Sequence, residues 1–248
     1  ILNAMEQLDQ HWYADWFDTP YYHILYKNRD HSEAKNFIKN LADHLQLPED
    51  AEVLDIACGR GRHSVYLNKL GFRVTGIDLS RNNIEYARQF ENDRLEFKVH
   101  DMCQPMPTTF DAVFNLFTSF GYFDTDEDNQ KAIQAMKANM KHGACGVIDF
   151  MNCEREIQHL KPYNEIEVDD ILFKITKWHD ADHIYKKIDF TDESGEHRFV
   201  ERVKILSIED FKRFFMAADL QLINVFGDYH LTDFEGDASK RLILLFRK

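Results

Sequence analysis

Three evenly spaced aspartates, Asp55, Asp78 and Asp101, lie at or beside the ends of three predicted strands, and a glycine turn follows the first. The turn contains Gly59 and Gly61, whose lack of a side chain lets a ligand approach the backbone closely. A helix that starts at such a turn directs its unpaired N–H groups towards an anion. A carboxylate at Asp78 can accept both hydroxyls of a ribose, and one at Asp101 can accept from an exocyclic amine.

Two ligand classes suit this turn, a dinucleotide and S-adenosylmethionine. A dinucleotide site needs room for a pyrophosphate and usually a third small residue, in the pattern G-x-G-x-x-G. Here Ser64 takes the third place, and Asp55 just before the turn puts a negative charge where a pyrophosphate would lie. The same charge is well placed to orient a turn that receives an amino-acid moiety, so the pattern favours the sulfonium cofactor. The alternative is structural: the glycines only form a turn and the aspartates only cap helices.

These residues belong to a regular alternation of strands and helices. Apolar runs predict strands at 52–56, 72–77, 95–99, 110–117 and 145–150. Helices are predicted after the first, second and fourth of these strands, and the one that begins near Thr125 is expected to stop at Gly143. The alternation predicts an α/β fold with a Rossmann-like, doubly wound and mostly parallel sheet that has helices on both faces, and two C-terminal strands bring it to seven strands.

The pattern changes after Asn152. Strands without helices between them are predicted at 171–178, 183–190 and 198–206. A capped helix at Ser207 and strands at 222–226 and 242–246 then return to the main sheet. We therefore expect an N-terminal helical and aromatic lid, a cofactor-binding domain in two pieces, and an antiparallel β insertion that acts as a substrate lid. The predicted boundaries are 1–50 for the lid segment, 51–152 with 207–248 for the cofactor domain, and 153–206 for the insertion.

The composition indicates which classes of binding partner are not expected. The 248 residues have a formal net charge of −13, which repels phosphate backbones and anionic lipid, so neither nucleic acid nor a membrane is an expected partner. Four cysteines without a C-x-x-C pair indicate reduced thiols and a cytoplasmic protein. His179 and His183 at a predicted hairpin tip are an incomplete ligand pair, so no metal is expected. Residues 1–4, before Met5, are expected to be a cloning remnant.

Four stretches resemble the class I S-adenosylmethionine-dependent methyltransferases. They are VLDIACGRGRHS (53–64), VTGIDLS (74–80), VHDM (99–102) and FDAVFNLFTSFGYF (110–123). The resemblance covers residues 34–152 well and the final helix and strand pair loosely, and it implies that S-adenosylmethionine is the cofactor. It implies contacts from the glycine turn to the methionine portion, from the second acid to the ribose, and from the third acid to adenine. The predicted cofactor-binding residues are Tyr22, Asp55, Ala57, Gly59, Gly61, Asp78, Leu79, Asp101, Met102, Asn115 and Leu116. Ala57 stands where many members have glycine.

Within that family, S-F-G-Y after the fourth strand and the antiparallel strands after the fifth are similar to small-molecule N-methyltransferases of the amino-sugar or glycine type. The N-terminal pattern Tyr22-x-x-Leu25-Tyr26-x-x-Arg29-Asp30 is similar to the amino-sugar enzymes. The resemblance implies that Tyr22 and Tyr13 belong to an arm that closes over the cofactor. Packing of these aromatics against the first helix is the alternative.

The implied reaction is direct displacement, in which a lone pair attacks the methyl group in line with the departing sulfur. An amine acceptor needs little beyond loss of a proton, whereas a hydroxyl acceptor needs a general base. Tyr13, His100 and His230 are the base candidates, and Tyr13 and His230 are the predicted catalytic residues. The predicted function is methylation of a small molecule, with an amine favoured. The alternatives are methylation of RNA or protein, nicotinamide-dependent oxidation, and cofactor binding without catalysis. The sequence predicts no oligomeric state.

Overall fold

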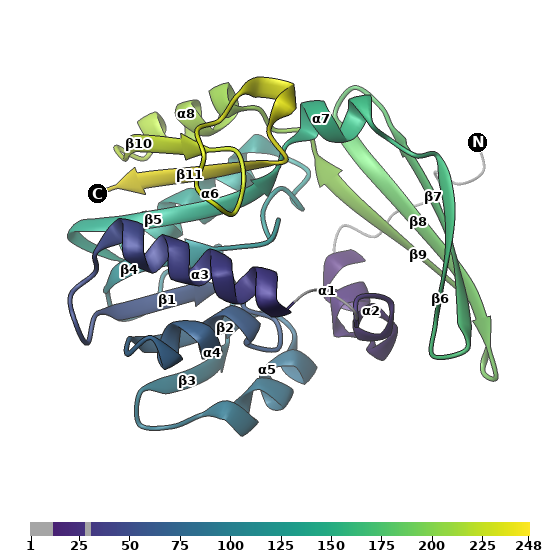
Figure 1. The fold of residues 1–248 in the computed structure, drawn as a ribbon, viewed down its shortest axis with the longest axis horizontal. Coiled ribbons are helices and arrows are strands. Elements are labelled where there is room, and N and C mark those ends of the chain that lie inside the picture. Colours follow the sequence, from purple (N-terminus) through teal and green to yellow (C-terminus); the bar gives the residue numbers. More distant parts are fainter. Residues whose placement is uncertain (1–11, 28–30) are drawn as a thin grey trace.

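A computed structural model describes residues 12–27 and 31–248 (Figure 1). The expected cloning remnant, residues 1–4, lies outside the described residues, and so does the Arg29–Asp30 pair.

A seven-stranded sheet forms the centre of the larger part of the molecule, in the order β10-β11-β5-β4-β1-β2-β3. Its strands are β1 (Glu52–Ile56), β2 (Arg73–Asp78), β3 (Leu95–Val99), β4 (Phe110–Asn115), β5 (Met140–Met151), β10 (Gln221–Phe226) and β11 (Arg241–Arg247). The neighbouring pairs from β5 to β3 are parallel, and β11 runs antiparallel to both β5 and β10. The predicted α/β fold with a seven-stranded, mostly parallel sheet is confirmed.

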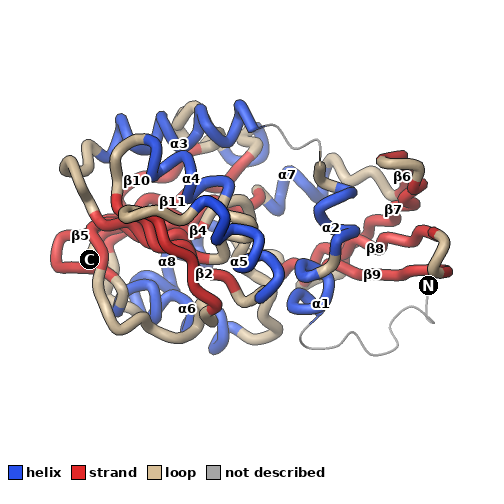
Figure 2. The backbone as a smooth tube through the Cα atoms, turned by 90° about the horizontal axis from the view of Figure 1, so that it is seen from below, coloured by secondary structure: helices blue, strands red, loops and turns tan. Residues whose placement is uncertain are grey.

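Helices cover both faces of this sheet (Figure 2). One face carries α3 (His31–Leu45), α4 (Arg62–Lys69) and α5 (Arg81–Ala87), and the other carries α6 (Asp126–Ala138) and α8 (Ile208–Ala217). A separate apolar core lies under each layer, with Phe37 and Ile84 in the first and Ile133 and Phe211 in the second. The central strands are apolar on both sides because both sides are covered.

The prediction that the helix after Thr125 ends at Gly143 is wrong. It ends at Ala138, and β5 starts at Met140, which pairs with Phe110 of β4. Asn139 makes the break: its side-chain oxygen accepts from the Met106 N–H at 2.7 Å, and its carbonyl accepts from the Phe110 N–H at 2.8 Å. These bonds tie Asn139 to the chain that leads into β4, so it cannot continue the helix.

A second, antiparallel sheet has the order β6-β7-β8-β9. Its strands are β6 (Tyr163–Val168), β7 (Ile171–His179), β8 (His183–Asp192) and β9 (Gly195–Lys204), and α7 (Cys153–Gln158) precedes them. The sequence predicts three strands here, and the structure adds β6 and the short helix. Glu165 and Glu167 make β6 polar on its outward face, which hides an edge strand from a search for apolar runs.

The N-terminal arm, α1 (Trp12–Asp18) and α2 (Pro20–Leu25), lies between the two sheets (Figure 1). Trp16 is buried against Phe199 of β9, with ring centroids 4.6 Å apart, and its indole N–H donates to Glu201 at 2.8 Å. The aromatic residues of this arm therefore pack an apolar core of their own with the second sheet. The predicted division into three domains stays a prediction.

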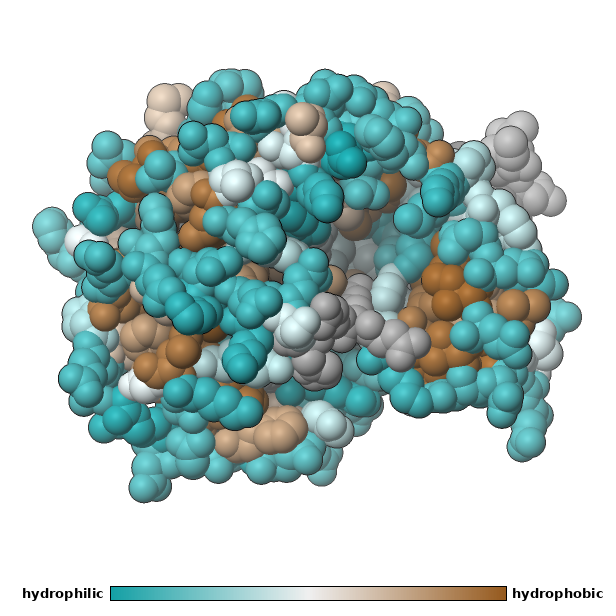
Figure 3. All heavy atoms as spheres, viewed as in Figure 1, coloured by the Kyte–Doolittle hydropathy of each residue, from teal (hydrophilic) through white to brown (hydrophobic). Residues whose placement is uncertain are grey.

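The surface seen in Figure 3 is mostly hydrophilic, with hydrophobic residues gathered over the second sheet. No helix within the described part of the chain is long and apolar enough to cross a membrane.

Candidate active site

A cavity of about 990 Å³ lies at the carboxyl ends of the parallel strands, and the N-terminal arm covers it. The ends of β1, β2, β3 and β4 supply its floor, and α1 and α2 supply residues from the opposite side. Open parallel sheets bind ligands at this edge. The volume is at the upper end of the range for small-molecule sites, roughly 300–1,000 Å³.

The glycine turn lines the cavity in a conformation that explains its composition. Ala57, Gly59 and Gly61 all have a positive φ, of 56°, 56° and 80°. A Cβ on Gly61 would lie 2.6 Å from the Phe97 ring, so this glycine is needed for packing. A Cβ on Gly59 would meet no atom within 4 Å, so this backbone faces open space from which a ligand can approach it. Ala57 adopts the left-handed conformation that glycine takes more easily.

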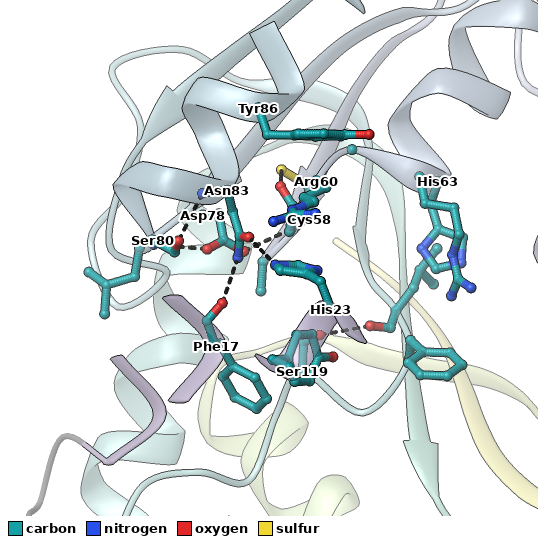
Figure 4. Close-up of a pocket in the computed structure, with 18 of the residues that line it drawn as sticks. Phe17, His23, Cys58, Arg60, His63, Asp78, Ser80, Asn83, Tyr86 and Ser119 are labelled. Carbon is teal, nitrogen blue, oxygen red and sulfur yellow. Dashed lines mark hydrogen bonds between the residues drawn. The ribbon is translucent and has the colours of Figure 1, made fainter. Parts of the chain in front are cut away.

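Asp78 ends β2 and points into the cavity (Figure 4). One carboxylate oxygen accepts from the Gly59 N–H at 2.8 Å, and the other accepts from the Ser80 N–H at 2.9 Å. Burial raises the pKa of Asp78 above its ordinary value, although these two N–H groups act in the opposite direction. A carboxylate oriented by two backbone donors still has lone pairs for two ribose hydroxyls. The geometry supports the predicted ribose contact.

Asp55 is placed differently from the other two acids. It is 1% exposed and is not among the residues that line the cavity. Its carboxylate accepts from the Ser64 hydroxyl at 2.5 Å, which ties the end of β1 to the first turn of α4. Burial raises the pKa of Asp55 to about 7, against the Ser64 hydrogen bond, which lowers it. Asp55 therefore acts on the glycine turn through Ser64.

Asp101, Met102 and Leu79 line the cavity beside Asp78. The Asp101 carboxylate is exposed and accepts from the Cys103 N–H at 2.9 Å. Their positions at the ends of β2 and β3 are compatible with the predicted adenine and ribose contacts, which stay predictions.

The two residues predicted at the end of β4 have separate positions. Leu116 lines the cavity. Asn115 is fully buried and does not line it; its amide donates to the Ile56 carbonyl at 3.2 Å and so joins β4 to β1. The Asn115 side chain therefore does not reach the cavity, and the structure does not support its predicted contact with the cofactor.

The arm brings Tyr13 and Tyr22 to the cavity, as predicted for a lid, and it adds residues that the sequence did not single out. The His23 ring lies 2.7 Å from the Asn83 side-chain oxygen, and the Asn83 amide donates to the Phe17 carbonyl at 3.2 Å (Figure 4). The Asp18 carboxylate accepts from the Ser80 hydroxyl. These contacts connect the arm to the start of α5, next to Asp78.

We expect Asp18→Ala to speed the release of S-adenosylhomocysteine about tenfold. The variant removes the hydrogen bonds that Ser80 and Asn82 donate to this carboxylate, and hydrogen bonds to charged groups contribute roughly 1.5–3 kcal/mol. Stopped-flow displacement measures the rate. Asp15→Ala, at an exposed position of the same helix, is the control and should leave the rate unchanged. Equal rates in the wild type and Asp18→Ala would show that the arm does not hold the ligand.

The two predicted catalytic residues are not brought together. Tyr13 lines the cavity, but burial, followed by the charge of Asp101, raises its pKa, so the phenol keeps its proton at neutral pH and is a poor base. His230 is exposed on the loop after β10 and does not line the cavity. His100 does line it, with Nε2 2.9 Å from the Gln104 carbonyl.

Four cationic side chains line the cavity, in contrast to the net charge of −13. They are Lys27, Arg60, Arg62 and Lys69. The Arg60 guanidinium lies over the Tyr86 ring at 4.5 Å, and its buried Nε has no hydrogen-bond partner (Figure 4). Arg60 and Arg62 flank Gly61, and Lys69 ends α4, whereas Lys27 follows α2 and is brought to the cavity by the arm. Over residues 12–27 and 31–248, no group of three or more His, Cys, Asp or Glu side chains could hold a metal ion.

Comparison with known proteins agrees with this site. Residues 53–143 match the family model of a methyltransferase domain. The chain is 26% identical over 227 residues to a glycine/sarcosine N-methyltransferase of Aphanothece halophytica, an alignment that covers 84% of this chain and 79% of that protein. It is 26% identical over 144 residues to a dTDP-3-amino-3,4,6-trideoxy-alpha-D-glucopyranose N,N-dimethyltransferase of Streptomyces venezuelae, with 55% of this chain and 56% of that protein covered.

The fold is shared with solved methyltransferase structures. The CcbJ methyltransferase of Streptomyces caelestis superposes with a TM-score of 0.78 at 16% identity, covering 96% of this chain and 98% of that one. A parallel sheet with a glycine turn and an acid at the second strand defines a nucleoside-binding α/β protein. More specifically, the chain belongs to the class I S-adenosylmethionine-dependent methyltransferases. It is an enzyme, and S-adenosylmethionine is its cofactor.

Proposed function

We propose that the enzyme methylates the amine of a small molecule that also carries an anionic group. The observation that carries this proposal is the covered cavity beside the glycine turn, with its aromatic walls and its cations. The aromatic residues that line it are Tyr13, Phe17, Tyr22, Tyr26, Tyr66, Tyr86, Phe90, Phe117, Tyr122 and Phe123.

The size of the cavity supports a small acceptor. A volume of about 990 Å³ has room for a nucleoside cofactor and one further small molecule. The arm packs against the second sheet, bonds to Ser80 at the start of α5 and covers the cavity, so a folded protein or an RNA helix would have to displace it. The net charge of −13 also disfavours RNA.

The arginines support an anionic group on the acceptor. Arg60 and Arg62 flank Gly61, at the start of α4, where the helix dipole also favours negative charge. Among the relatives, two are named for methylation of glycine and of an amino sugar linked to a nucleoside diphosphate. Both of those acceptors combine an amine with an anionic group.

S-adenosylmethionine supplies an electrophilic methyl group on a sulfonium. The protein's part is to place the acceptor nitrogen close to that group and to keep water out, which are large contributions to bimolecular transfer. Tyr13 and Tyr22 from the arm and Tyr122 from the loop after β4 form walls that exclude water. An amine that arrives unprotonated needs no strong base, which agrees with the raised pKa of Tyr13.

A panel of acceptors tests the proposal through the release of S-adenosylhomocysteine. We expect turnover with an amine such as glycine, sarcosine or a dTDP-linked amino sugar, and none with tRNA, with denatured protein or with alcohols. Arg60→Gln should raise KM for the anionic amine about tenfold and leave KM for a neutral amine unchanged. Arg73→Gln, at an exposed position at the far end of β2, is the matched control. Turnover of tRNA or protein alone would overturn the proposal.

A further inference from the structure

Two consecutive residues at the end of β4 have an uncommon backbone conformation. Phe117 and Thr118 have φ angles of 65° and 57°, and neither is glycine. The left-handed region is unfavourable for residues with a Cβ, and it is most so for a β-branched one such as threonine. Strain of this kind persists only where the surroundings fix it, and it is concentrated at functional sites.

Asp149 accepts the hydrogen bonds that hold Phe117 and Thr118 in this conformation. This residue of β5 is fully buried. Its side-chain Oδ2 accepts from the Phe117 N–H at 2.8 Å, and its main-chain carbonyl accepts from the Thr118 N–H, also at 2.8 Å. One residue thus holds both strained amides, one through its side chain and one through its backbone.

Arg241, the first residue of β11, completes the arrangement. Its Nε donates to Asp149 Oδ1 at 2.7 Å, and its Nη2 donates to the Thr118 hydroxyl at 2.8 Å. Tyr229 also donates to Asp149 Oδ2, at 3.2 Å. Burial acts to lower the pKa of Arg241, but the Asp149 carboxylate beside it raises that pKa above its ordinary value. The pair is therefore a charged connection between β5, β11 and the strained turn.

The turn held in this way belongs to the wall of the cavity. Leu116, Phe117, Ser119, Tyr122 and Phe123 all line it. The Phe117 ring faces the Arg62 guanidinium, at 4.9 Å, so it lies beside one of the cations at the start of α4. The Tyr122 hydroxyl donates to the Thr118 carbonyl, which fixes the later part of the loop to the strained turn.

We propose that Asp149 and Arg241 are positioning residues for the methyl acceptor. They hold Phe117 and Thr118 in the left-handed conformation and so set the wall formed by residues 116–123. This inference rests on the proposed function for the identity of the acceptor, but the effect on the turn can be measured without it. Neither residue lines the cavity, so each acts through the loop and not by contact with a ligand.

The test compares Asp149→Asn with the wild type. Hydrogen exchange of the segment 115–120 should accelerate at least tenfold, with the segment 53–61 unchanged. With the amine that the acceptor panel identifies, kcat should fall at least tenfold, because small misplacements of reacting groups are costly. The Kd for S-adenosylhomocysteine should stay within threefold, because Asp78 and the glycine turn are untouched.

Two further variants separate positioning from general stability. Asp111→Asn breaks another ion pair between β4 and β5, with Lys141, at the opposite end of the strands, and should leave kcat unchanged. Thr118→Gly added to Asp149→Asn should restore part of kcat, because glycine adopts a positive φ without the hydrogen bonds that hold Thr118 there.

Unchanged exchange of 115–120 in Asp149→Asn would overturn the inference, and so would equal losses of kcat in Asp149→Asn and Asp111→Asn. If the wild type methylates no amine, the proposed function fails, and the exchange result still decides whether this pair holds the turn.

Discussion

Replacement of Asp78 by alanine should weaken the binding of S-adenosylmethionine at least 100-fold. Its carboxylate is held by the N–H groups of Gly59 and Ser80, at 2.8 and 2.9 Å, and lies in the cavity wall. Two hydrogen bonds from ribose hydroxyls to this charge would contribute about 1.5–3 kcal/mol each, so their combined loss corresponds to a factor of roughly 100 or more. The variant also leaves the Gly59 N–H without its acceptor, which loosens the turn itself.

Titration calorimetry with S-adenosylmethionine measures this effect. Asp78→Asn keeps the shape but loses the charge, and it places an amide donor against one of the two N–H groups, so it should also bind at least 100-fold more weakly. Asp101→Ala removes an exposed carboxylate and should cost no more than about tenfold. Thermal unfolding of each variant checks that the fold is retained. Binding by Asp78→Ala within threefold of the wild type would remove Asp78 from the cofactor site.

Replacement of Asp55 by asparagine should change how the stability depends on pH. The unfolded chain releases this proton near the ordinary pKa of 3.8, whereas burial raises the pKa to about 7 in the folded protein. Between these values the folded state binds more protons, so the free energy of unfolding falls as the pH rises. The contribution of protonated Asp55 is fully present below about pH 4 and is lost as the pH rises through 7. At 1.36 kcal/mol per pH unit, the loss is about 4 kcal/mol.

Asparagine has no proton to lose and can still accept from the Ser64 hydroxyl. Asp55→Asn should therefore match the wild type near pH 4 and be more stable by a few kcal/mol at pH 8. Urea unfolding from pH 4 to 8.5 measures this.

Asp111→Asn is a control, because folding lowers the pKa of Asp111 and raises that of Asp55, so the two replacements should change the stability in opposite directions. Burial acts to raise the pKa of Asp111, but the Glu52 N–H and the Lys141 ammonium bring it below the ordinary value. Asp111 therefore stabilises the protein above its unfolded pKa, and its replacement should destabilise the protein at neutral pH. Parallel pH profiles for the wild type and Asp55→Asn would show that Asp55 is ionised in the folded state across this range.

Much of the main sheet could be predicted from the sequence because its strands are buried on both faces and appear as apolar runs between glycine turns and caps. Ser80, Thr125 and Ser207 cap α5, α6 and α8 with their side chains, as such residues do at helix starts. The end of α6 could not be predicted, because its C-cap residue Asn139 bonds through its carbonyl to Phe110 and through its side chain to Met106, residues distant in the sequence.

Some residues of the candidate site could likewise be predicted from the sequence, and others could not. The glycine turn and Asp78 follow one another at strand ends, so their proximity follows from the topology of a parallel sheet. No local pattern marks His23, Asn83 or the Asp149–Arg241 pair, because contacts between separate elements bring them to their positions. Arg60 belongs to the glycine turn, but its contact with Tyr86 of α5 depends on the fold. His230 was predicted from its residue type alone, and the structure places it outside the cavity.

The reversed strand β11 has a consequence for the order in which the enzyme is made. It enters the sheet between β5 and β10, and it carries Arg241 to the turn at Phe117 and Thr118. During translation, β1 to β5 and the glycine turn leave the ribosome well before β11. The wall formed by residues 116–123 is therefore completed only after residue 241 has been synthesised, because Arg241 donates to both Thr118 and Asp149.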